Sequence, residues 1–192
     1  VFLLLSFWKN STENYYSEIM KNDLTEGRMA FEKQLDIMCA GAFSVSNDSD
    51  LKWVYFLDGL KDGDNNIAAL IRCNDMLRQT FADSEHYQNY SVIMKNELIF
   101  RKSGMVVGDK FFYDNYCTYQ NTDFETWRKQ SFESNTWQLF PLEEIDTGER
   151  TFQAMTFSYP VRNYIQQEPE ANAVVQFLLS KENLEQMFGQ LL

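Results

Sequence analysis

The sequence predicts an α+β domain in which a long N-terminal helix packs on a mostly antiparallel sheet of about five strands, followed by a C-terminal helix. Two features of the residue pattern carry this prediction. Apolar residues recur at helical spacing in the N-terminal part of the chain, whereas after His86 they alternate with a period of two. The alternating segments are short and follow one another closely, which favours antiparallel pairing.

The long N-terminal helix is predicted over residues 9–43. No proline interrupts this region, and Ser11 or Thr12 would cap its start. Gly27 falls on the apolar face, so we expect a bend or a close helix contact there. This face would pack on the domain or form a coiled coil with a second copy. Its residues are spaced mostly three, four or seven apart: Tyr16, Met20, Leu24, Phe31, Leu35, Met38 and Ala42.

An apolar run, Val1–Trp8, precedes this helix. It is too short to cross a bilayer, which takes about 20 apolar residues. We interpret residues 1–8 as the end of a transmembrane helix. The alternative is an ordinary first turn of a helix that packs on the domain.

Two further helices are predicted before the strands. The apolar block from Leu51 to Leu60 would form a short helix capped by Ser49 or Asp50. Asp62 to Asn66 suggests a calcium loop, but its sixth position lacks the required glycine, so we expect a turn whose end caps the next helix. That helix has positions at helical spacing: Ile67, Leu70, Ile71, Asn74, Leu77 and Phe81.

Five segments read as strands. Three are short and are separated by turns at Asn96-Glu97 and Ser103-Gly104; the last two are longer and apolar enough for central positions in the sheet. The segments are Tyr90–Met94, Leu98–Phe100, Met105–Val107, Thr151–Val161 and Ala171–Ser180. Ser180 would then cap a terminal helix over Lys181–Leu192.

Between the short and the long strands lies an aromatic stretch, Phe111–Pro141, which is too long for a plain loop in a compact domain. Long loops with structure of their own tend to be functional, so we expect a pocket here. By the period of two, Met155, Phe157 and Tyr159 share one face of the following strand. We expect that face to point at the aromatic stretch.

The composition and the absence of known motifs argue against several classes of function. A formal net charge of -11 argues against nucleic-acid binding by this domain. Cys39, Cys73 and Cys117 form no CxxC pair and are odd in number, so we interpret them as buried thiols. His86 is the only histidine, which excludes a multi-histidine metal centre, and we place it on the surface. Because no nucleotide-binding or hydrolase motif occurs, we expect neither an enzyme nor a cofactor.

The order of the aromatic segments and the last two strands carries a family resemblance. Phe112–Tyr116, Phe124–Arg128, Trp137 with Phe140-Pro141, and the strands Phe152–Val161 and Ala173–Leu179 resemble the extracellular Cache sensor domains of bacterial receptors. Among these, the chain resembles the sensors of membrane-bound AraC-type regulators and of histidine kinases from Gram-positive bacteria. The resemblance implies that residues 44–192 form a PAS-like module that holds a small molecule between its sheet and the loops above it.

The resemblance also implies a role. The chain would be an extracellular sensor, anchored in the bacterial membrane through flanking helices, that binds an amino acid, organic acid, sugar or peptide and passes occupancy to a cytoplasmic output domain. Aromatic walls and one guanidinium would suit such a ligand. The candidate ligand-binding residues are Tyr113, Tyr116, Trp127, Arg128, Trp137 and Tyr159. The alternative is that the tryptophans are core residues, and that the module binds a protein or forms a homodimer without a small-molecule ligand.

Overall fold

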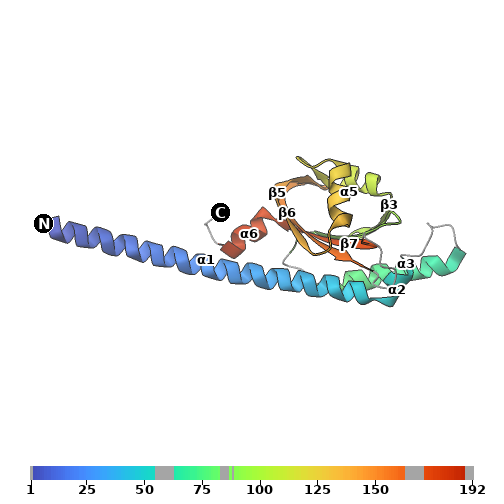
Figure 1. Ribbon diagram of the computed structural model, residues 1–192, viewed down its shortest axis with the longest axis horizontal. Coiled ribbons are helices and arrows are strands. Elements are labelled where there is room, and N and C mark those ends of the chain that lie inside the picture. The colour runs from blue at the N-terminus through green and yellow to red at the C-terminus, as the bar shows by residue number, and fades with distance from the viewer. Residues whose placement is uncertain (1, 55–62, 83–86, 88, 163–170, 189–192) are drawn as a thin grey trace. The chain divides into compact units, whose positions relative to one another are not determined.

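The computed structural model describes residues 2–54, 63–82, 87, 89–162 and 171–188. The chain divides into two compact units, one made of residues 1–36 with 182–192 and the other of residues 37–181. Helix α1 (Phe2–Asn47) contributes to both units, and helix α6 (Lys181–Phe188) follows the last strand (Figure 1). The predicted long N-terminal helix and C-terminal helix are confirmed.

In the first unit, α1 and α6 approach each other closely at Gly27. A Cβ atom at Gly27 would lie 3.0 Å from the carbonyl oxygen of Met187 and would overlap the ring of Phe188. The rings of Phe31 and Phe188 have centroids 6.0 Å apart. Glycine is needed here because no other residue leaves room for the second helix. The close helix contact expected at Gly27 is confirmed.

The ends and the apolar face of α1 differ from the prediction. Because the helix begins at Phe2, Ser11 and Thr12 lie inside it, and the N-cap predicted there is wrong. Met20 and Leu24 are exposed, although they follow the helical spacing. Among the described residues, no helix is both long and apolar enough to span a membrane. The transmembrane interpretation of residues 1–8 stays a prediction.

In the second unit, helices α2 (Ser49–Val54) and α3 (Gly63–Thr80) follow α1. The Leu51 backbone N–H donates to Asp48 Oδ1 at 2.8 Å, so Asp48 caps α2 in place of Ser49 or Asp50. Residues 64–66 lie within α3 rather than before it. Residues 55–62, and with them the end of the predicted short helix and Asp62, lie outside the described residues, as does His86.

Only part of the apolar face predicted for α3 is buried. Leu70, Leu77 and the following Phe81 are buried, but Ile67 and Ile71 are exposed. Helical spacing alone could not separate these two sets, because both fall within one broad stripe of the helix.

The described strands form one antiparallel sheet of seven, in the order β3-β2-β1-β7-β6-β5-β4. Their bounds are β1 (Asn89–Met94), β2 (Leu98–Arg101), β3 (Gly104–Val107), β4 (Thr118–Tyr119), β5 (Gln138–Asp146), β6 (Thr151–Val161) and β7 (Ala173–Ser180). The α+β fold, the antiparallel pairing and the inner positions of the two long strands are confirmed. The expected count of about five was too low, since β4 and β5 were not recognised.

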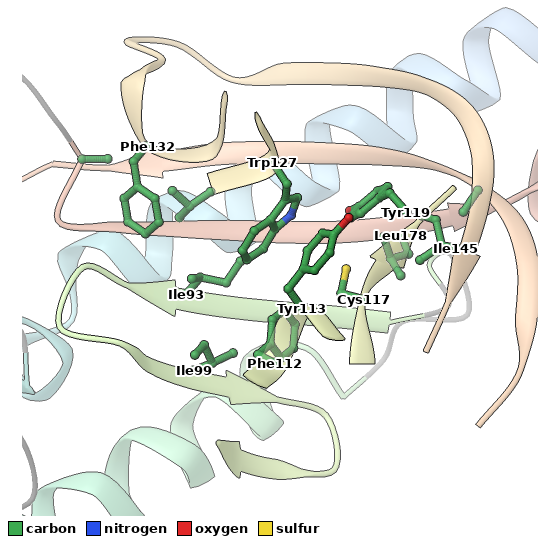
Figure 2. Packing of buried hydrophobic residues seen from close by; sticks show 13 residues of the cluster. Ile93, Ile99, Phe112, Tyr113, Cys117, Tyr119, Trp127, Phe132, Ile145 and Leu178 are labelled. Atoms are coloured by element: carbon green, nitrogen blue, oxygen red, sulfur yellow. The ribbon is translucent and has the colours of Figure 1, made fainter. Parts of the chain in front are cut away.

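The two faces of the sheet carry separate cores. Helices α4 (Asp109–Tyr116) and α5 (Phe124–Glu133), formed by the aromatic stretch, cover one face (Figure 1). Figure 2 shows the buried cluster beneath them, with members that include Ile93, Ile99, Phe112, Tyr113, Cys117, Tyr119, Trp127, Phe132, Ile145 and Leu178. On the other face, the ring centroid of Phe81 lies 4.6 Å from that of Tyr90 and 5.3 Å from that of Phe177.

The start of α5 is set by Asp123. Its Oδ1 accepts the Thr126 backbone N–H at 2.7 Å, as an N-cap does. This hydrogen bond lowers the pKa of the Asp123 carboxyl, because it favours the ionised form. The cap therefore fixes where α5 begins, and with it the position of Trp127 one turn later.

Candidate functional site

A pocket of about 230 Å³ lies under α5, between this helix, β5 and the sheet. A cavity of about 150 Å³ can hold benzene, so this one has room for a small metabolite. The lining residues come from segments far apart in the sequence: Tyr119 of β4, Asn121 and Thr122 after it, Trp127, Gln130 and Ser131 of α5, Phe140, Pro141, Leu142 and Glu143 of β5, and Gln176 of β7.

A β-bulge in β5 shapes one wall of this pocket. The register of β5 against β6 shifts between Phe140 and Glu143, so that Pro141 and Leu142 lie opposite a single residue of β6. In a regular strand, neighbouring side chains point to opposite faces, and four consecutive residues could not line one pocket. Proline suits the bulge because it has no N–H to donate to the ladder. The irregularity thus turns a continuous run of β5 toward the space under α5.

Gln176 forms the floor of the pocket and is only 2% exposed. Its Nε2 donates to Ser131 Oγ at 2.9 Å, and Ser131 Oγ donates to the Trp127 carbonyl oxygen at 2.7 Å. Since the hydroxyl proton of Ser131 is already used, the amide nitrogen of Gln176 is the group that faces it. Gln176 Oε1 is left buried, without a hydrogen-bond partner among the described residues.

Trp127 provides a second buried polar atom. The side chain is 4% exposed, and Nε1 has no hydrogen-bond partner in the described part of the chain. Leaving such a group unpaired costs about 1–3 kcal/mol, so unpaired buried donors are rare in folded proteins. An unpaired donor and an unpaired acceptor in residues of one pocket are groups that a bound molecule could satisfy.

Glu143 is the one charged residue among the described residues that line the pocket. Its Oε2 accepts the Asn121 backbone N–H at 3.2 Å, and its Oε1 accepts the Thr122 hydroxyl at 3.2 Å. These two hydrogen bonds orient the carboxylate. An ionised carboxylate can accept about four hydrogen bonds, so it can still accept hydrogen bonds from a ligand.

Tyr119 closes the pocket next to the sheet. Its hydroxyl lies 2.9 Å from Thr156 Oγ1. Burial raises the pKa of the Tyr119 phenol well above its usual value, and the nearby Cys117 and Glu143 raise it further. The phenol is therefore neutral at physiological pH and acts through its hydrogen bond and its ring.

An aromatic cluster supports Trp127 from behind. Its ring centroid lies 5.4 Å from that of Tyr113, 6.1 Å from that of Phe112 and 6.0 Å from that of Phe124. The Tyr113 hydroxyl donates to the carbonyl oxygen of Thr122, and burial raises the pKa of this phenol. Figure 2 shows Trp127 and Tyr113 side by side above the sheet. This packing holds the indole in one orientation.

Of the six residues predicted to bind a ligand, Trp127 lines the pocket and Tyr113 lies directly behind it. Tyr116 is half-buried and stacks under the guanidinium of Arg101, which lies 3.8 Å from the ring centroid. Arg128 forms an ion pair with Asp109 and borders an open groove on the outer side of α5 rather than the pocket. The guanidinium expected to supply charge to the ligand is thus paired within the protein.

Trp137 and Tyr159 lie on the opposite face of the sheet. Trp137 is half-exposed and stacks on Phe157, with ring centroids 5.7 Å apart. The ring of Phe157 in turn packs near that of Phe177, with centroids 6.0 Å apart, in the core on the α3 side of the sheet. Tyr159 is two residues after Phe157 on β6 and so shares its face. The structure does not bring Trp137 and Tyr159 together with Trp127.

The expectation that Met155, Phe157 and Tyr159 face the aromatic stretch is therefore wrong. The face that does so includes Thr156, which bonds to Tyr119. The period of two separates the residues of a strand into two sets, but it does not say which set lies under which helix.

The residues that the sequence prediction missed are mainly Gln176, Ser131 and Glu143. One signal was present: β7 reads Ala-Val-Val-Gln-Phe-Leu-Leu-Ser and is buried along its whole length, so a glutamine at its centre must have a partner or a function. Proline within Gln138–Asp146 was a second signal, because proline inside a strand points to an edge or a bulge. For metals, the described residues contain no group of three or more ligating side chains.

The same fold occurs in extracellular and periplasmic sensory domains of histidine kinases and chemoreceptors. The ligand-binding domain of the Campylobacter jejuni chemoreceptor Tlp3, solved in complex with 4-methylisoleucine, matches with a TM-score of 0.62 and 14% identity over 93% of this chain and 62% of that chain. The periplasmic sensory domain of the Campylobacter jejuni chemoreceptor Tlp1 matches with a TM-score of 0.54 and 12% identity over 88% and 62%. The extracellular domain assigned to a histidine kinase, vpHK1S-Z8, gives 0.60 and 11% over 94% and 62%.

At these identities the likeness shows the fold alone, and it is the fold of bacterial sensory domains that the resemblance implied. The chain spans less than two thirds of the length of each of these structures. No family model matches the sequence, and a search of curated proteins gives no significant relative. The matched structures named here give no support to an AraC-type receptor.

Proposed function

We propose that this chain is the extracellular small-molecule sensing domain of a membrane-anchored bacterial signalling receptor. The observation that carries the proposal is the pocket under α5, where Trp127 Nε1 and Gln176 Oε1 are buried without partners among the described residues. A mostly apolar pocket with a few converging polar groups is the usual form of a small-molecule site.

The comparisons support this reading through the fold. The Tlp3 domain was solved with a bound 4-methylisoleucine, and the pocket described here has a volume suited to a molecule of amino-acid size. We propose that segments flanking the domain anchor it in the membrane and carry ligand occupancy to a cytoplasmic output domain. Because the matched structures named above come from histidine kinases and chemoreceptors, output of those kinds is favoured. The domain would bind its ligand and release it unchanged.

The proposal is tested by a thermal-shift screen of the purified chain against amino acids, amines, organic acids, sugars and short peptides. A ligand at 100 times its Kd adds about 2.7 kcal/mol to the free energy of unfolding. For a chain of this size, that should raise Tm by roughly 5–10 °C. Recovery of the ligand unchanged after prolonged incubation would agree with binding without catalysis.

Two variants on α5 locate the site. Gln130 lines the pocket, whereas the adjacent Lys129 borders the outer groove, and both side chains are exposed. Gln130→Trp should fill the pocket and abolish the ligand-dependent rise in Tm, while Lys129→Trp should leave it intact. If no compound of any class shifts Tm and the protein instead binds a protein or self-associates, the alternative of a protein-binding or dimerisation module gains support.

A further inference from the structure

We propose that the ligand is a small organic cation, with a protonated primary amine and a neutral oxygen acceptor but without a free carboxylate. This inference rests on the proposed sensing function and specifies the chemistry of its pocket. Three observations support it: the charge of the lining, its unpaired polar atoms and the pairing of the nearby arginine.

The charge of the pocket favours an amine. Glu143 is the sole charged side chain among the described lining residues, and its carboxylate is held in place by Asn121 and Thr122. The Gln176 Oε1 atom adds a buried acceptor with no partner in the described part of the chain. An ammonium group carries three donors and no acceptor, so it matches a lining whose charged group and unpaired amide oxygen are both acceptors. Bonds between an ionised donor and a carboxylate are the stronger class of hydrogen bond.

The same lining disfavours a carboxylate on the ligand. A buried carboxylate needs a cation beside it, and no Lys or Arg is among the described residues that line this pocket. Arg128 follows Trp127 directly in the sequence, but it pairs with Asp109 outside the pocket. A ligand carboxylate would also be repelled by the Glu143 carboxylate. This repulsion would lower the affinity of the pocket for anionic and zwitterionic molecules.

The remaining donor defines the second polar group of the ligand. Trp127 Nε1 carries one uncharged N–H, buried and unpaired with any described residue. It can bond to a hydroxyl, ether or amide oxygen at the other end of a small amine. The apolar walls, Phe140, Pro141 and Leu142, leave space for a short hydrocarbon part. Amino alcohols and amino-acid amides combine these features.

The experiment compares ligands that share a hydrocarbon part and differ in charge. Isothermal titrations at pH 7 would use L-leucinamide and L-leucinol as cations, L-leucine as zwitterion and 4-methylpentanoate as anion, with the corresponding valine and phenylalanine series. We expect at least one amide or amino alcohol to bind at least tenfold more tightly than its amino acid, and the acids not to bind. Binding by none of these amines would overturn the proposal.

Variants assign the interaction to named groups. Glu143→Gln should weaken amine binding by at least tenfold, whereas Glu144→Gln, at the neighbouring exposed position that does not line the pocket, should leave it unchanged. Trp127→Phe keeps an aromatic ring, although a smaller one, and removes the N–H, so it should weaken binding several-fold. Thermal unfolding of each variant checks that the fold is retained.

The two proposals fail in different ways. If leucine or an organic acid binds more tightly than the amines, and Gln130→Trp blocks that binding, the pocket is a sensing site but its ligand class is not the one argued here. If no compound of any class binds, or if binding persists undiminished in Gln130→Trp, the sensing function of this pocket itself fails.

Discussion

Gln176 Nε2 donates a hydrogen bond to Ser131 Oγ across 2.9 Å and so joins the central strand β7 to helix α5. The two residues are 45 positions apart in the sequence and both are buried. Ser131 extends the link to the backbone of Trp127. A molecule that bonds to Gln176 Oε1 would therefore act on a side chain that already connects the sheet with the helix above the pocket.

Removing the hydroxyl of Ser131 should destabilise the protein. Ser131→Ala leaves Gln176 Nε2 buried without an acceptor, at a cost of about 1–3 kcal/mol in the free energy of unfolding. Replacing both partners with apolar groups avoids an unpaired polar atom. The double variant Ser131→Ala, Gln176→Leu should therefore recover most of the loss in urea denaturation. Strict additivity of the two single effects would show that the bond contributes nothing.

Truncation of Trp127 should affect folding as well as binding. The indole packs against Phe112, Tyr113 and Phe124 and is 4% exposed. Trp127→Ala is expected to cost about 3–5 kcal/mol, as large-to-small changes in a core do. Trp127→Phe should unfold at a clearly higher urea concentration than Trp127→Ala; equal midpoints would argue that the ring packs poorly.

The fold was largely predictable because its main elements have strong local patterns. The long helix, the short strands β1 to β3 and the apolar strands β6 and β7 each carry a clear local signal in the sequence: helical spacing, flanking turns or a long apolar run. Strand β5 does not, because Pro141 and the bulge interrupt its alternation and much of the strand is only partly buried. Strand β4 has two residues, too few to show a period.

The site was harder to predict than the fold, since it depends on which strand faces meet which helices. The aromatic stretch that composition singled out does contribute to a pocket, which Trp127 lines. Trp137 and Tyr159 were grouped with it by composition, yet the sheet separates them from it. Gln176 and Ser131 become a pair only when β7 is placed under α5, which no local pattern encodes.

Two buried thiols should make the protein less stable in alkali. Burial raises the pKa of both Cys73 and Cys117 from about 9 to about 12. A group whose pKa is higher in the folded state stabilises fully below its unfolded pKa, and this contribution is lost as pH rises through the folded value. The urea midpoint should therefore fall between about pH 9 and pH 12, and less steeply in a Cys73→Ala, Cys117→Ala variant.

The same thiols should resist alkylation in the folded protein. The thiolate is the reactive form, and at pH 8 both groups are protonated and buried. Mass spectrometry after iodoacetamide treatment should find Cys73 and Cys117 unmodified in native protein and modified in urea. Rapid modification of either residue under native conditions would contradict its placement in the core.

Gly27 offers a test of the contact between α1 and α6. In an exposed helix interior, Gly→Ala stabilises by about 0.5–1 kcal/mol, because alanine loses less backbone entropy. Here the added Cβ would overlap the Phe188 ring and lie 3.0 Å from the Met187 carbonyl oxygen. We therefore expect Gly27→Ala to increase hydrogen exchange of the α6 amides rather than to protect them. The double variant Gly27→Ala, Phe188→Ala removes the overlapping ring but keeps the 3.0 Å backbone contacts, so adding Gly27→Ala to Phe188→Ala should change exchange less than adding it to the parent protein. A Gly27→Ala protein that is more stable, with α6 exchange unchanged, would mean that α6 does not rest on this glycine.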